Sequence, residues 1–135
     1  MKYFTLIIMA VSLCGTGACN KNGLTDPSSS EIAGRWRWVK SVGGIGGFTL
    51  TPASEGFNQT QVFNADSTFK MYRNDSLTAQ KQYSVTRNYK YNGQVYDLLK
   101  IGDFTGSAFI IRNDTLYTQD IFIADGFDNV YVRIK

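Results

Sequence analysis

Apolar and polar residues alternate along most of the chain after residue 33, and this pattern predicts β-strands. In Gly34–Val42 the alternation places Trp36 and Trp38 on one face and Arg35 and Arg37 on the other. Tyrosine, phenylalanine, valine, isoleucine and threonine are frequent, and no stretch keeps a helical period. The chain is therefore predicted to be all-β.

Turn residues divide the rest of the chain into further strands. These are expected at Phe57–Phe63, Thr68–Arg73, Gln80–Tyr91, Val95–Ile101, Ser107–Arg112, Thr115–Ile123 and Asn129–Lys135. The strongest hairpin signal is Asn92-Gly93, because a type I′ turn needs positive φ at both central residues. The long strand before it is expected to contain a bulge near Arg87-Asn88.

Short connections between successive strands predict a meander, in which neighbours in sequence pair in space. An open meander leaves two exposed edges, and closure into a barrel removes them. We therefore predict a small antiparallel up-and-down β-barrel of about eight strands, whose interior is either filled by side chains or holds one small ligand. A β-sandwich is the alternative fold.

A glycine-rich segment follows the first predicted strand. Gly43, Gly44, Gly46 and Gly47 lie close together, and the segment runs on to Gly56 with too many glycines for a regular element. It opens no helix, so it does not fit a phosphate-binding loop. We predict that it is a mobile lid at the mouth of the barrel.

The amino end has the pattern of an export signal. Lys2 precedes the apolar stretch Tyr3–Leu13, which is shorter than the roughly 20 residues of a membrane-spanning helix. Gly17 and Ala18 then lead to Cys19, and this resembles the lipobox of bacterial lipoproteins, although Thr16 stands where leucine is usual. The resemblance implies a signal peptide over residues 1–18 and acylation of Cys19. A secreted protein with a free thiol is the alternative.

Residues 19–30 are predicted to form a flexible tether between the acylated Cys19 and a barrel domain over residues 31–135, because the segment is polar and contains a serine run. The resemblance implies a lipid bilayer as partner and the cell envelope, most simply the outer membrane, as location. Cys14 would leave with the signal, so no disulfide can form in the mature fold. Loss of Lys2 lowers the formal net charge from +3 to +2, which does not suggest a nucleic-acid partner.

The first and last predicted strands carry residues that resemble those of a second known family. Gly34-x-Trp36 opens the first strand, Phe63–Phe69 forms a hairpin, and Arg133 lies in the last strand. Together with the glycine-rich loop, this resembles the lipocalin family and more closely the lipocalin-like domains of bacterial lipoproteins. The resemblance implies that Gly34, Trp36 and Arg133 form a structural plug, with the arginine packed across the indole.

The composition argues against an enzyme. The chain has no histidine, and no cysteine is free for nucleophilic work. Asp120, Asp125, Asp128 and Asn129 lie close in sequence but do not match an EF-hand, and turns explain them equally well. We expect no cofactor and no metal.

Two further groups of residues leave alternatives open. Six tyrosines could line a cavity, or they could instead fill the barrel or cover its outside: Tyr83, Tyr89, Tyr91, Tyr96, Tyr117 and Tyr131. Three Asp-Ser/Thr triplets begin at Asp66, Asp75 and Asp114; they resemble O-glycosylated triplets of exported bacterial proteins and equally fit turns.

The functional expectation is a membrane-anchored lipocalin-like lipoprotein that binds a small apolar or amphipathic ligand without catalysis. The alternative is a barrel with a solid core, which docks an envelope partner through its loops or outer surface. The sequence leaves the ligand and the oligomeric state open.

Overall fold

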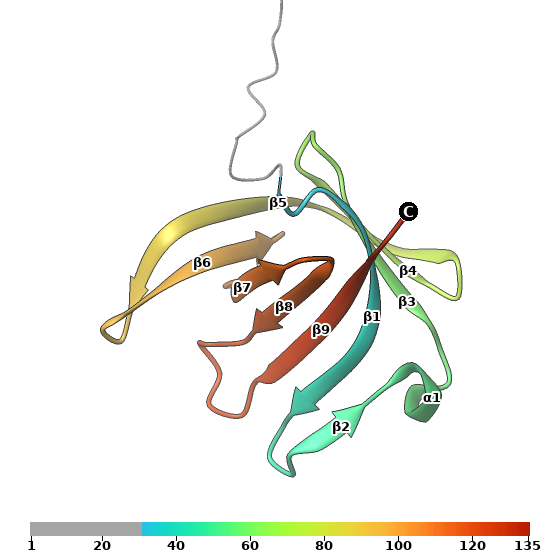
Figure 1. Ribbon diagram of the computed structural model, residues 1–135, viewed down its shortest axis with the longest axis horizontal. Coiled ribbons are helices and arrows are strands. Elements are labelled where there is room, and N and C mark those ends of the chain that lie inside the picture. Colours follow the sequence, from blue (N-terminus) through green and yellow to red (C-terminus); the bar gives the residue numbers. More distant parts are fainter. Residues whose placement is uncertain (1–30) are drawn as a thin grey trace, which may run out of the picture.

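A ring of eight antiparallel strands closes on itself in the computed structural model, which describes residues 31–135 (Figure 1). In chain order the elements are β1 (Gly34–Gly43), β2 (Phe48–Leu50), α1 (Pro52–Glu55), β3 (Gln59–Phe63), β4 (Thr68–Arg73), β5 (Ser76–Tyr91), β6 (Gln94–Ile101), β7 (Ser107–Arg112), β8 (Thr115–Gln119) and β9 (Phe127–Ile134). The predicted up-and-down barrel is confirmed, and the sandwich alternative was wrong.

The ring closes where β1 pairs with β9. On β1, Trp36 lies opposite Arg133 of β9 on one side and opposite Gln61 of β3 on the other. The remaining barrel strands follow in sequence order, and β2 pairs only with the last residues of β1. The first and last strands therefore hold each other, and β2 is an addition at one end of the barrel.

The inner face of the ring carries the hydrophobic core. Its completely buried large side chains include Ile32, Trp36, Phe63 and Leu116, and burying a side chain of this size contributes roughly 1.5–3 kcal/mol. The predicted faces are confirmed for three pairs, because both members pack in or against the core: Trp36 with Trp38, Phe69 with Met71, and Tyr83 with Val85.

The predicted hairpin and bulge of the longest strand are present. Asn92 and Gly93 have φ angles of 49° and 76°, as the type I′ turn requires. The register between β5 and β6 shifts between Thr86 and Tyr89, and Asn88 within this bulge has a φ of 55°.

The prediction that the glycine-rich segment up to Gly56 holds no regular element was wrong. β2 pairs with the end of β1, and α1 follows as a single helical turn. Thr51 caps α1 through reciprocal hydrogen bonds with Ser54, Pro52 occupies the first turn, and Gly56 ends the helix at a φ of 72°. The glycines cluster in the turn between β1 and β2, so they leave the rest of the segment free to form structure.

Four strand boundaries differ from those predicted by two or more residues, and the first is that of β3, which begins at Gln59 rather than Phe57. β5 begins at Ser76 rather than Gln80, because Asn74 and Asp75 form a tight turn with positive φ angles. β8 ends at Gln119 rather than Ile123, and β9 begins at Phe127 rather than Asn129. The Asp120 carboxylate accepts hydrogen bonds from Ser107 Oγ and from the Phe127 backbone, and this fixes the start of the β8–β9 loop.

The predicted signal peptide, Cys19 and the tether lie outside the described residues, so they stay predictions. Within residues 31–135, no helix has the length and apolar character needed to cross a bilayer.

Candidate functional site

Trp36 and Arg133 meet at one end of the barrel. The guanidinium carbon of Arg133 lies 4.1 Å from the centre of the Trp36 ring system, and Trp36 Nε1 donates a hydrogen bond to the Ile32 carbonyl at 2.8 Å. Gly34 leaves room for this contact, since a Cβ there would lie 2.5 Å from Arg133 Nη1. The structure therefore brings together the three residues predicted to form a plug.

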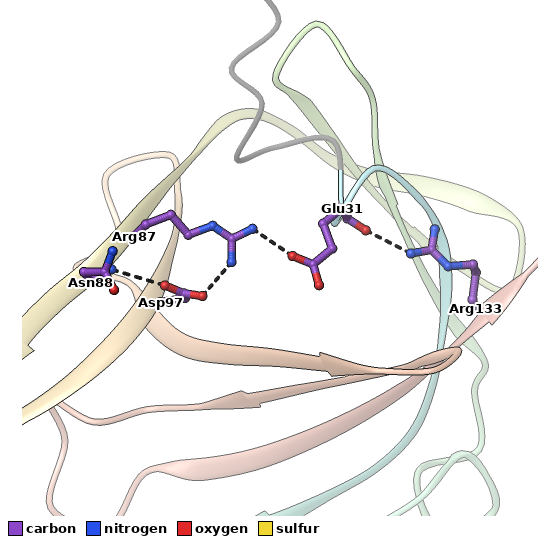
Figure 2. Close-up of polar contacts among 5 residues, drawn as sticks. All are labelled: Glu31, Arg87, Asn88, Asp97 and Arg133. Atoms are coloured by element: carbon purple, nitrogen blue, oxygen red, sulfur yellow. Dashed lines mark hydrogen bonds and ion pairs between the residues drawn. The ribbon is translucent and has the colours of Figure 1, made fainter.

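A short segment before β1, Glu31–Ala33, crosses this end of the barrel, and we call it the strap. Arg133 donates hydrogen bonds to the Glu31 and Ala33 carbonyls at 2.9 and 2.8 Å. The Glu31 carboxylate pairs with Arg87 of β5 at 2.9 Å, as Figure 2 shows. The strap thus connects β9 to the bulge of β5, and its central residue, Ile32, is completely buried.

Arg87 is held from two sides. Its guanidinium also pairs with Asp97 of β6 at 2.5 Å, and Asp97 accepts a hydrogen bond from the Asn88 backbone (Figure 2). Burial lowers the pKa of Arg87, but its hydrogen bonds to Asp97 and Glu31 outweigh that effect and raise the pKa. The charge is permanent and serves to fix the strap to the bulge.

A second aromatic stack closes the opposite end of the barrel. Phe57, just before β3, stacks on Trp38 with ring centres 5.8 Å apart, and the guanidinium carbon of Arg73 lies 3.9 Å from the Phe57 ring centre. Trp38 Nε1 donates to Ser41 Oγ at 2.9 Å, and Ser41 donates to Asn129 of β9. Each tryptophan of β1 therefore supports an arginine-capped stack at its own end.

Core side chains lie in the interior between these two stacks. Gln61 Nε2 donates to the Tyr131 hydroxyl at 3.2 Å, and both side chains are buried. Burial raises the pKa of Tyr131 to about 12, and the hydrogen bond from Gln61 opposes this shift. The interior is thus occupied by packed and hydrogen-bonded protein groups near both ends.

The predicted lid is the turn of the β1–β2 hairpin. The Gly47 backbone donates to Gly44 at 3.0 Å, and Gly44 donates to the Asp125 carbonyl at 3.2 Å. Gly43 has a φ of 153° and passes so close to the Gly126 backbone that a Cβ would lie 2.3 Å from its oxygen. Movement of this turn over a ligand stays a prediction.

A hollow of about 670 Å³ lies beside β7, β8 and β9, and we call it the outer groove. Ile110 lies opposite Tyr117, and Tyr117 lies opposite Val130. Their chain neighbours Phe109, Leu116 and Tyr131 belong to the core, and successive residues of a strand point to opposite faces. This apolar row therefore lies on the outer face of the barrel, where Ile110 is 47% and Tyr117 is 41% exposed.

Polar groups and the β5–β6 hairpin complete the outer groove. The hairpin contributes Asn88, Val95, Tyr96 and Asp97, and the strands add polar side chains that include Arg112 and Asp128. The groove therefore combines a central apolar row with polar groups at its margins.

The six tyrosines divide into three pairs. Tyr83 and Tyr131 are in the core, and Tyr96 and Tyr117 line the outer groove. Tyr89 and Tyr91 contact Phe122 of the β8–β9 loop with ring centres 6.1 and 4.9 Å apart. The core positions of Tyr83 and Tyr131 and the outer position of Tyr117 both fit the second alternative, in which the tyrosines fill the barrel or cover its outside.

The predicted acidic candidates do not converge on one point. Asp120 bonds Ser107, Asn129 lies inside the barrel between Ser41 and Thr118, and the Asp125 carbonyl holds the β1–β2 turn. Among residues 31–135 no cluster of three or more metal-ligating side chains occurs.

Asp66, which begins one of the three Asp-Ser/Thr triplets, accepts a hydrogen bond from the Thr68 backbone, and this bond is the main cause of its lowered pKa.

The sequence did not predict the stack of Phe57 on Trp38, the ion pairs of Arg87 or the outer groove. A signal for the groove was present, since Phe109-Ile110-Ile111 and Val130-Tyr131-Val132 are apolar at consecutive positions. Such runs indicate strands that are apolar on both faces.

Comparison with protein-family models, curated proteins and solved structures finds no match for the chain. The resemblances to lipoproteins and lipocalins therefore stay predictions from the sequence.

Proposed function

We propose that this protein is a lipid-anchored, non-catalytic binding module of the cell envelope, and that it takes a small amphipathic molecule in the outer groove. The acylated Cys19 is the anchor in this proposal, and residues 20–30 are the tether. The proposal keeps the class of ligand expected from the sequence and moves its site from the barrel interior to the outer face.

The outer groove is the observation that carries the proposal. Its volume of about 670 Å³ falls within the roughly 300–1,000 Å³ of small-molecule sites. The row of Ile110, Tyr117 and Val130 suits an apolar body, and Arg112 and Asp128 at the margins suit a polar head. Two stacks and the core side chains already occupy the interior near both ends.

Native mass spectrometry of the protein purified from its own membranes tests this proposal. We expect a small molecule to co-purify with the wild type and to be lost from Ile110→Asp, which places a charge in the apolar row. Leu77→Asp is the matched control, because Leu77 of β5 is 52% exposed and does not line the groove. Retention of the molecule by Ile110→Asp would contradict the proposal. The proposal would also be contradicted if no small molecule co-purified with the wild type and no added amphiphile changed its melting temperature.

The β1–β2 hairpin supports a second candidate function, docking of an envelope protein. In this hairpin Ile45 is 93% exposed and Phe48 is 63% exposed. The hairpin follows the end of β1, whereas the strap precedes its start. In this alternative Ile45→Ser abolishes capture of one membrane partner, whereas Ile110→Asp does not.

A further inference from the structure

A second hollow lies on the far side of β1 from the outer groove. Its volume is about 350 Å³, and its lining residues come from β1, β3, β4 and the adjoining turns: Arg35, Thr60, Val62, Asn64, Lys70, Tyr72 and Asp75. Arg35 lies opposite Val62, and Val62 lies opposite Lys70. Two cationic side chains therefore flank one valine on three adjacent strands.

These strands present the lining residues on the outside of the barrel. The chain neighbours Trp36, Phe63 and Phe69 are buried in the core, so the alternation turns Arg35, Val62 and Lys70 outward. The next row toward the opposite end of the barrel pairs Thr60 with Tyr72. The hollow is thus built on paired strands, which hold its floor in a fixed register.

The two cations are available to a ligand. Among residues 31–135, neither Arg35 nor Lys70 makes an ion pair. The charge of Lys70 acts on Asp66 only as the last of several influences on that carboxylate. No hydrogen bond within the described residues uses the side-chain oxygen of Thr60 or of Tyr72.

This combination suits a phosphate group. A guanidinium donates paired hydrogen bonds to two phosphate oxygens, and an ammonium adds a compact charge beside it. The hydroxyls of Thr60 and Tyr72 and the amide of Asn64 are further donors at the same hollow. We propose that this hollow binds a phosphate group through Arg35 and Lys70.

Asp75 makes the two ends of the hollow different in charge. It belongs to the β4–β5 turn, and the row of Tyr72 lies between it and the row of Arg35 and Lys70. Its carboxylate disfavours a second negative charge at that end of the hollow. This arrangement favours a phosphate ester whose uncharged part extends toward Asp75 over a ligand with a second negative charge there.

The position of Arg35 makes a phospholipid headgroup one source of this phosphate. Arg35 lies four residues after Glu31, so the hollow is near the end of the barrel where the chain leads back to Cys19. A soluble phosphate ester is the other source, and the same two cations would bind either one.

Nuclear magnetic resonance of the full mature protein in phosphate-free detergent micelles tests the site. The probes are inorganic phosphate, glycerol 1-phosphate and phosphatidylglycerol added to the micelles, read from the backbone amides of Arg35, Val62 and Lys70. We expect Arg35→Gln/Lys70→Gln to weaken binding at least about tenfold, since two charge-assisted hydrogen-bonding groups are lost.

The control removes equal charge elsewhere. Lys90→Gln/Lys100→Gln changes two lysines of β5 and β6 outside the hollow and leaves the same net charge. Equal weakening by both double variants, or by neither, would overturn the proposal. If only phosphatidylglycerol binding depends on Arg35 and Lys70, the lipid headgroup is the ligand. If glycerol 1-phosphate shows the same dependence, a free ester suffices.

Asp75→Asn provides a test in the opposite direction. Asparagine tolerates the φ of 65° at this turn position and removes the negative charge. Binding of inorganic phosphate should tighten by up to about fivefold, the usual range for one exposed charge. Weaker binding by this variant would place the phosphate elsewhere and overturn the site.

Discussion

Tyr131 shows how much the barrel interior changes the chemistry of a single side chain. Its hydroxyl is buried and accepts a hydrogen bond from Gln61 Nε2, so ionisation would place a negative charge among core residues. Burial accordingly raises the pKa of this phenol from 10.0 to about 12. The packed interior therefore stabilises the neutral form of the Tyr131 phenol.

This shift predicts alkaline destabilisation. Because the pKa is higher in the folded state, the contribution of Tyr131 is fully present below pH 10 and is lost as the pH rises toward 12. At pH 11 the loss should be about 1 kcal/mol. Urea unfolding at pH 8 and pH 11 should show this loss of stability in the wild type and in Tyr117→Phe, but not in Tyr131→Phe. The same pH dependence in all three proteins would contradict the assignment.

At the scale of elements, turn residues decide where strands end. The Asn92-Gly93 turn between β5 and β6 uses positive φ at both residues, and a residue with a Cβ adopts this region only at a cost. The turn therefore depends on backbone conformation rather than on contacts, since nothing lies within 4 Å of a Cβ built on Gly93.

Gly93→Ala should lower the free energy of unfolding by about 1 kcal/mol through backbone strain alone. Lys90→Ala, at an exposed position of β5 near the same turn, is the control and should have little effect. Chemical denaturation of both variants measures the difference. Equal stability of Gly93→Ala and the wild type would mean that the turn adopts another conformation.

The same local signals explain which elements could be predicted. Alternation and turn dipeptides predicted the barrel strands because both act within a few residues. The density of glycines around residues 43–47 obscured α1, although Thr51-Pro52-Ala53-Ser54 contains its capping box. Phe57 and Arg73 could not be placed on Trp38 from the sequence, because that stack depends on tertiary packing between distant segments.

For the whole molecule, closure depends on joining the two ends of the described chain. Arg133 of β9 packs on Trp36 of β1 and holds the strap through the Glu31 and Ala33 carbonyls. Residues 31–135 contain no cysteine, so these noncovalent contacts do the joining within the described part of the chain. The resemblance to lipocalins pointed to this pair, and the strap emerged only from the structure.

Arg133→Ala should lower the free energy of unfolding by about 2–4 kcal/mol, since it removes one cation–π contact and two hydrogen bonds. Gly34→Ala should also destabilise the barrel, because its Cβ would lie 2.5 Å from Arg133 Nη1. The double variant should be more stable than the sum of the two losses predicts, because the arginine that clashes is gone. Strict additivity in a double-mutant cycle would contradict this contact.

The strap also determines how the barrel bears mechanical load. A pull on the chain at Glu31 acts on β1, which is hydrogen-bonded on both sides, to β3 and to β9. A load along β1 would have to break ladder hydrogen bonds on both of its sides. Before β1 is loaded, the pull must also break the contacts of Glu31 with Arg87 of β5 and with Arg133 of β9. The strap contacts would therefore shield β1 from a force applied at the amino end of the described chain.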